Sequence, residues 1–133
     1  MILYTAGYNN WVDDDFFKTL RELNEDYVVI DVRFSPFSKM PWWTKKALSN
    51  ELGESYIHMG KLGNINYNSV NSLIKIADIE TCEKVIQIMN KGFVCILLCA
   101  CDEYDKCHRK IVAEEIQKRT DCKIRQLEEL HED

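Results

Sequence analysis

Two runs of consecutive apolar residues constrain the fold more than any other feature of this sequence. Every residue of Phe93–Cys99 is apolar, and Tyr27–Ile30 is apolar up to a charged end at Asp31. A strand with one face in water alternates apolar and polar residues, whereas a strand covered on both faces is apolar throughout. The two runs therefore predict a parallel sheet with helices packed on both of its faces.

Further strand and helix patterns alternate with these runs along the chain. Strand patterns occupy 2–6, 27–33, 56–59, 93–99 and 122–127; helical patterns begin at the caps Asp13 and Thr44, the second ending at Gly53, and occupy 78–91 and 106–119. Parallel strands separated by helices are joined by right-handed crossovers. We therefore predict an α/β fold, a single Rossmann-like three-layer domain over residues 1–133 with a mostly parallel sheet of about five strands.

Composition narrows the class of partner. A net charge of -5 over 133 residues argues against sequence-independent binding of duplex nucleic acid, which depends on neutralising phosphates. No apolar stretch approaches the roughly 20 residues of a membrane span, and the first residues show no basic leader. We therefore expect a cytoplasmic protein without a membrane partner, and the sequence leaves its oligomeric state open.

The six cysteines are the next constraint. In a reducing cytosol, clustered cysteines indicate metal binding or thiol chemistry more often than structural disulfides. Cys82, Cys95 and Cys122 lie in or beside helix and strand patterns, and the simplest interpretation is that they are small buried apolar residues. The cysteines at 99, 101 and 107 are the candidates for chemistry.

Polar residues follow the predicted strands at the point where each one ends. Because parallel strands share one carboxyl edge, and ligands bind outside that edge, these residues are expected to meet there. They are Thr5 and Gly7, then Asp31 and Arg33, then His58 and Gly60, then Cys99 and Cys101. A charge at Arg33 after a buried strand needs either solvent or an anionic partner, and that partner is a ligand or a carboxylate such as Asp31.

The segment 98–109 allows three interpretations. In a thiol enzyme, Cys101 or Cys107 attacks, His108 or His58 moves protons, and two arginines hold an anion; the helix N-terminus, His108 and Arg109 favour the Cys107 thiolate. In a metal site, the four soft ligands are Cys99, Cys101, Cys107 and His108, although their spacing is not that of a zinc finger. In a purely structural arrangement, the cysteines pack and Arg109 pairs with Asp102, Asp105 or a carboxylate at the edge of the sheet.

The loop after Arg33 contains further candidates. Ser35, Ser38 and Lys39 together with Arg33 form a reasonable subsite for phosphate or carboxylate, while simple turn capping is the alternative for the serines. The adjacent Trp42 and Trp43 cannot both point inward easily, so one is expected in the core. Tyr8, beyond the first strand, is a candidate for the opposite wall.

These motifs resemble, in the same order along the chain, those of the "domain of unknown function 488" family. The matching segments are Thr5–Tyr8, Asp31–Ser38, His58–Gly63, Leu97–Cys101 and Cys107–Arg109, spread over about residues 3–118. The resemblance implies a cytosolic Rossmann-like domain in a family without an established activity. By matching of the motifs, the resemblance also implies a set of site positions in this chain: Thr5, Gly7, Asp31, Arg33, Pro36, Ser38, His58, Gly63, Cys101, Cys107, His108 and Arg109. The chain departs from the pattern at Asn9 and in the Asn-rich segment 64–71.

The sequence thus favours a cysteine-dependent enzyme, a transferase or hydrolase without a cofactor, acting on a small anionic substrate that is nucleotide-like or phosphorylated. The predicted catalytic residues are Cys101, Cys107, His108 and Asp31, and the predicted substrate-binding residues are Thr5, Gly7, Tyr8, Arg33, Ser35, Ser38, His58 and Arg109. Three alternatives stay open: a non-catalytic module for a nucleotide or single-stranded nucleic acid, a redox-responsive interaction protein, and a Cys/His metal-binding protein.

Overall fold

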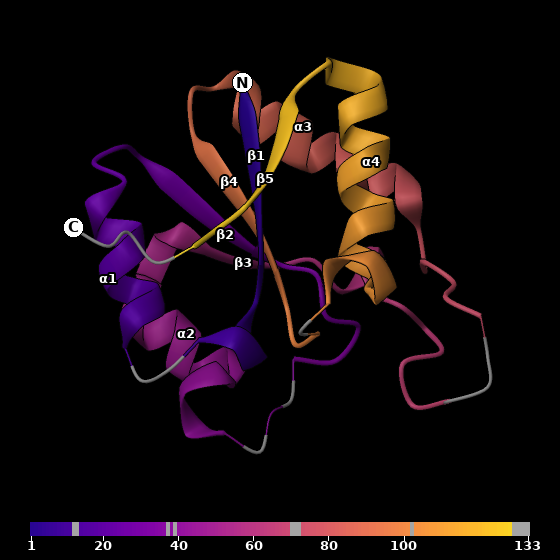
Figure 1. The fold of residues 1–133 in the computed structure, drawn as a ribbon, viewed down its shortest axis with the longest axis horizontal. Coiled ribbons are helices and arrows are strands. Elements are labelled where there is room, and N and C mark those ends of the chain that lie inside the picture. Colours follow the sequence, from indigo (N-terminus) through magenta and orange to yellow (C-terminus); the bar gives the residue numbers. More distant parts are fainter. Residues whose placement is uncertain (12–13, 37, 39, 70–72, 102, 129–133) are drawn as a thin grey trace.

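One five-stranded parallel sheet organises the chain, as Figure 1 shows. The computed structural model describes residues 1–11, 14–36, 38, 40–69, 73–101 and 103–128. The strands are β1 (Ile2–Gly7), β2 (Tyr27–Asp31), β3 (Tyr56–His58), β4 (Val94–Cys99) and β5 (Lys123–Gln126), in the spatial order β3-β2-β4-β1-β5. The α-helices between them are α1 (Asp15–Glu22), α2 (Lys45–Leu52), α3 (Cys82–Asn90) and α4 (His108–Thr120).

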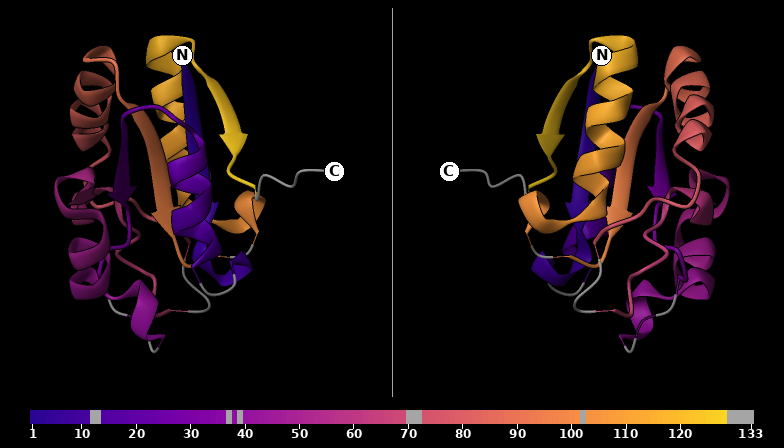
Figure 2. Two further views of the ribbon diagram at one scale, coloured as in Figure 1. Left: turned by 90° about the vertical axis from the view of Figure 1, so that its left-hand side faces the viewer. Right: turned by 90° about the vertical axis from the view of Figure 1, so that its right-hand side faces the viewer.

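The apolar strand β4 lies at the centre of the sheet, between β2 and β1. Leu97 is opposite Ile30 of β2 and Thr5 of β1. Residues of β4 alternate between two cores: Cys95, Leu97 and Cys99 pack with α3 and α4, while Ile96 and Leu98 pack with α1 and α2. Figure 2 shows α1 in front of the sheet in one view and α4 in front of it in the opposite view. The predicted three-layer α/β fold with a parallel sheet is confirmed.

Several element boundaries differ from those expected. Strand β2 ends at Asp31, and two residues later the Arg33 side chain turns back onto the Asp31 carboxylate. A 3₁₀ turn at Ile79–Thr81, capped by the Asp78 side chain, precedes α3. Helix α4 begins at His108 with Cys107 as its cap, and the expected cap of α1, Asp13, lies outside the described residues.

The tryptophan pair divides between core and surface, as its position in the sequence suggested. Trp43 is buried and stacks on Tyr8, with ring centroids 5.0 Å apart, whereas Trp42 is 52% exposed. The stack connects the start of α2 to the segment that follows β1. It therefore fixes the position of Tyr8 at the carboxyl edge of the sheet.

Two further features concern the state of the cysteines and the length and apolar character of the helices. All six cysteines are free thiols, and five of them are buried. No helix in the described part of the chain has both the length and the apolar character to cross a membrane.

The central position of β4 predicts an unequal response to one substitution at two sites. Ile96→Ala empties space between β4 and the helices α1 and α2, so the free energy of unfolding is expected to fall by about 2–5 kcal/mol. Ile111→Ala removes the same atoms from a side chain on α4 that is 41% exposed, and is expected to change it by less than about 0.5 kcal/mol. Urea unfolding followed by circular dichroism measures both values. Equal losses would contradict the assignment of β4 to the core.

Candidate functional site

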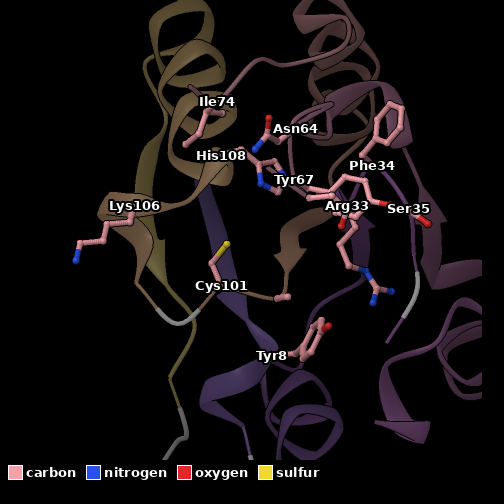
Figure 3. Close-up of a pocket in the computed structure, with 12 residues that line it drawn as sticks. Tyr8, Arg33, Phe34, Ser35, Asn64, Tyr67, Ile74, Cys101, Lys106 and His108 are labelled. Atoms are coloured by element: carbon pink, nitrogen blue, oxygen red, sulfur yellow. The ribbon is translucent and has the colours of Figure 1, made fainter. Parts of the chain in front are cut away.

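A cavity of about 550 Å³ lies beyond the carboxyl ends of β1, β2 and β4. Figure 3 shows Tyr8, Arg33, Cys101 and His108 arranged around it. Aromatic side chains from Tyr8, Phe34 and Tyr67 make up much of its wall, and Ser35, Asn64 and Asn68 add neutral polar groups. The volume is typical of a site for a small molecule.

Asp31 and Arg33 form a buried ion pair beside this cavity. Arg33 donates from Nε to Asp31 Oδ1 at 2.8 Å and from Nη2 to Asp31 Oδ2 at 2.6 Å. The Tyr56 hydroxyl donates to Oδ2 at 2.5 Å, and Arg33 Nη1 donates to the Trp43 carbonyl at 2.6 Å. Of the two partners expected for Arg33, the structure shows the carboxylate of Asp31.

The contacts of this ion pair shift the pKa of Arg33 and of the neighbouring Tyr56. Burial opposes the charge of Arg33, but its hydrogen bond to Asp31 and the nearby carboxylate raise its pKa overall. Burial and the Asp31 carboxylate also raise the pKa of Tyr56. Both groups therefore keep their protons, and Arg33 reaches the cavity already paired with a counter-charge.

The turn after β2 is held from the side of β3. His58 Nε2 donates to the Arg33 carbonyl oxygen at 2.8 Å, which fixes the ring and its tautomer. Gly63 packs so closely that a Cβ there would lie 2.3 Å from the Cα and N atoms of Phe34. The His58–Gly63 motif therefore positions Arg33 and Phe34 at the cavity.

Three sulfur atoms and one imidazole nitrogen meet at the junction of β4 and α4. One ligand atom from each of Cys99, Cys101, Cys107 and His108 lies within 4.8 Å of the others. Cys99 Sγ is 2.8 Å from Cys107 Sγ, and Cys107 Sγ is 3.7 Å from His108 Nδ1. His108 Nε2 donates to the Val32 carbonyl at 2.7 Å, so Nδ1 is directed at the sulfurs.

The contacts within the cluster lower the pKa of Cys107 and raise the pKa of Cys99 and His108. Hydrogen bonds from Cys101 and Cys99 lower the pKa of Cys107, while the neighbouring Cys101 and Cys107 raise that of Cys99. Burial disfavours the charged imidazole of His108, but the sulfurs of Cys101 and Cys107 outweigh it and raise the pKa to about 9. Negative charge in the cluster is therefore favoured at Cys107 over Cys99.

Arg109 lies behind the cluster, away from the cavity. It is buried and donates from Nη1 to Cys99 Sγ at 3.1 Å and to the Cys101 carbonyl at 2.9 Å. Its Nε donates to Thr5 Oγ1 at 3.2 Å. A Cβ at Gly7 would lie 1.7 Å from the Cys101 carbonyl oxygen, so only glycine lets the loop of Cys101 pass β1 this closely.

The predicted site residues therefore separate into two groups. Those that line the cavity are Tyr8, Arg33, Ser35, Cys101 and His108. Those that support it from behind are Thr5, Gly7, Asp31, His58, Cys107 and Arg109. Ser38 accepts a hydrogen bond from the Met40 amide at 3.1 Å, as in the turn-capping alternative. Lys39 and Asp102 lie outside the described residues.

Sequence reasoning predicted Tyr8 but missed two other aromatic residues of the cavity wall, Phe34 and Tyr67. Phe34 and Tyr67 are 43% and 53% exposed, and their ring centroids lie 6.0 Å apart. Tyr67 belongs to the Asn-rich segment, which has no helix or strand periodicity. The one sequence signal for Tyr67 as a site residue was that a large aromatic residue lies in a polar loop.

A comparison with known families bears on the part of the chain that holds the ion pair. Residues 14–70 match the family model DUF488, described as "Domain of unknown function DUF488". The resemblance expected from the motifs is confirmed over these residues, which contain the Asp31–Ser38 and His58–Gly63 motifs. The cysteine-histidine cluster lies outside the matched residues. No curated protein and no solved structure matches the chain.

The buried ion pair between Asp31 and Arg33 predicts a large cost for one small substitution. Asp31→Asn leaves the guanidinium of Arg33 buried without its counter-charge, so the free energy of unfolding is expected to fall by about 3–5 kcal/mol. Asp14→Asn, which removes the carboxylate of an exposed pair with Lys18, is expected to cost about 1 kcal/mol or less. Chemical denaturation compares the two variants. A cost for Asp31→Asn as small as that for Asp14→Asn would show that the pair does not hold the edge of the sheet.

Proposed function

We propose that this protein is a thiol-dependent transferase or hydrolase that binds a small molecule in the cavity and reacts with it through Cys101. One observation carries the proposal: of the six cysteines, Cys101 alone lines the cavity and is half-buried, whereas the other five are at most 2% exposed. A nucleophile must be reachable by its substrate, and the thiolate is the reactive form of cysteine.

The reaction is a displacement at an electrophilic carbon of the bound molecule. The Cys101 thiolate forms a carbon–sulfur bond, and the bond from that carbon to the leaving group breaks, so the leaving group departs with the electron pair. Transfer to water then gives a hydrolase, and transfer to another acceptor gives a transferase. The surrounding sulfurs, His108 Nδ1 and the guanidinium of Arg109 favour negative charge in this cluster.

The lining of the cavity narrows the substrate class. The rings of Phe34, Tyr67 and Tyr8 favour a planar, aromatic or heteroaromatic group. Neutral amides and hydroxyls from Asn64, Asn68 and Ser35 can hydrogen-bond to its edge.

The charged residues around the cavity also narrow the substrate class. Arg33 is paired with Asp31, and Lys106 forms an exposed pair with Glu103. His108 lines the cavity but lies against the Cys107 sulfur, and Arg109 does not line the cavity. The described residues thus offer little unpaired positive charge to a ligand. A planar substrate with at most one negative charge fits this site better than the multiply charged phosphate that the two arginines suggested.

An activated aromatic ester tests the proposal directly. With 4-nitrophenyl acetate, the protein is expected to release about one equivalent of 4-nitrophenolate per chain in a rapid burst, because acetyl transfer to Cys101 precedes slow hydrolysis. Stopped-flow absorbance measures the burst, and mass spectrometry locates the acetyl group.

Two matched substitutions decide the outcome. Cys101→Ala is expected to abolish the burst, whereas Cys95→Ala, at a buried cysteine on β4, is expected to keep it. A burst that survives Cys101→Ala, or acetylation spread over the other cysteines, would exclude Cys101 as the nucleophile.

A further inference from the structure

We propose that Cys99, Cys101, Cys107 and His108 bind one zinc ion. Their ligand atoms all lie within 4.8 Å of one another, and they come from the end of β4, the loop after it and the first turn of α4. The proposal goes beyond the thiol chemistry above, because it concerns what holds the sulfurs together and in the thiolate form.

The donor set is the first argument. Three thiolates with one imidazole form a common structural zinc site, and such soft ligands select zinc over magnesium or calcium. The short loop after β4, with a 3₁₀ turn at Tyr104–Lys106, brings Cys107 back against Cys99. Tertiary structure therefore assembles a zinc ligand set whose spacing in the sequence does not resemble a zinc finger.

The orientation of the imidazole is the second argument. His108 Nε2 donates to the Val32 carbonyl at 2.7 Å, and a carbonyl can only accept, so Nε2 carries the proton. In the neutral ring, the lone pair of Nδ1 then faces the sulfurs, 3.7 Å from Cys107 Sγ. Zinc-bound histidines are held in this way, with the second ring nitrogen donating to a backbone carbonyl or carboxylate.

The charge of Arg109 is the third argument. Its guanidinium is 2% exposed and, within the ranges that the structure describes, forms no salt bridge with a carboxylate. It donates to Cys99 Sγ at 3.1 Å, and its backbone N–H donates to Cys107 Sγ at 3.5 Å. A divalent ion bound by three thiolates and a neutral imidazole carries one net negative charge, which this buried cation balances.

Zinc binding needs no oxidant or co-reactant. The three thiols lose their protons to solvent as the metal–sulfur bonds form. Cys101 lines the cavity, so one of the bound thiolates faces the substrate space. The zinc site thus supplies Cys101 as a thiolate for the proposed transfer without depending on that transfer.

Cobalt titration of the whole chain tests the proposal. The protein is reduced, freed of metal with a chelator and titrated with Co²⁺ under anaerobic conditions. We expect saturation at one Co²⁺ per chain, visible bands of a tetrahedral ion, near-ultraviolet sulfur-to-cobalt charge transfer, and displacement of Co²⁺ by Zn²⁺.

Four variants assign the ligands. Cys99→Ala is expected to lose stoichiometric binding, and Cys95→Ala, the same change at an equally buried position of β4, is expected to retain it. Cys101→Ala, at the half-buried ligand, is expected to lower the charge-transfer intensity by about a third, since two of three sulfurs remain. Arg109→Gln is expected to weaken binding by about 10- to 100-fold while leaving the bands in place.

The outcomes separate this proposal from the proposed function. A folded, reduced chain without cobalt charge transfer overturns the zinc site, as does an unchanged spectrum in Cys101→Ala. Stoichiometric zinc without a nitrophenolate burst supports the zinc site and rejects the thiol transfer. A nitrophenolate burst from a chain that binds neither Co²⁺ nor Zn²⁺ supports the thiol transfer and rejects the zinc site.

Discussion

The pairing of β4 with β1 on one side and β2 on the other is the constraint on which the site depends. Backbone hydrogen bonds fix the register of these three parallel strands, so that they end at one edge. Tyr8, Arg33 and Cys101 then leave three separate strands and meet around one cavity. The packing is close, because the carbonyl of Cys101 occupies the space that a side chain at position 7 would need. The cavity and the cluster are therefore built on the carboxyl edge of the sheet.

The two buried arginines at this edge have different counter-charges, and this difference determines what the site can do. Arg33 is paired with a permanent carboxylate, Asp31, so it contributes hydrogen-bonding geometry to the cavity and little net charge. Arg109 contacts a hydroxyl, a carbonyl and the sulfur of Cys99. Because a sulfur bears negative charge only as a thiolate, Arg109 favours the state that can react or bind a metal. An arginine in a sequence signals a nearby anion, but it does not say whether that anion is a ligand or part of the protein.

Much of the fold could be predicted because it depends on local pattern. Unbroken apolar runs at 27–30 and 93–99 require cover on both faces, and the intervening helical periodicities supply it. The shared carboxyl edge follows from parallel topology alone, which is why Arg33, Cys101 and His108 could be placed together. The boundaries were less predictable. Cys107 is an unusual helix cap, and the contact of Arg33 with Asp31 at the end of β2 is one that no periodicity encodes.

The sequence by itself determined the layers of this protein, the direction of its strands and the edge at which its candidate site residues gather, because hydrophobic periodicity and crossover handedness act locally. Only the tertiary structure decided which residues face the cavity and which stand behind it. It paired Arg33 with Asp31, turned Arg109 toward sulfur, placed Phe34 beside Tyr67 and brought Cys99 against Cys107. These relations depend on side-chain direction and on contacts between segments far apart in the chain, and neither is contained in the spacing of the residues.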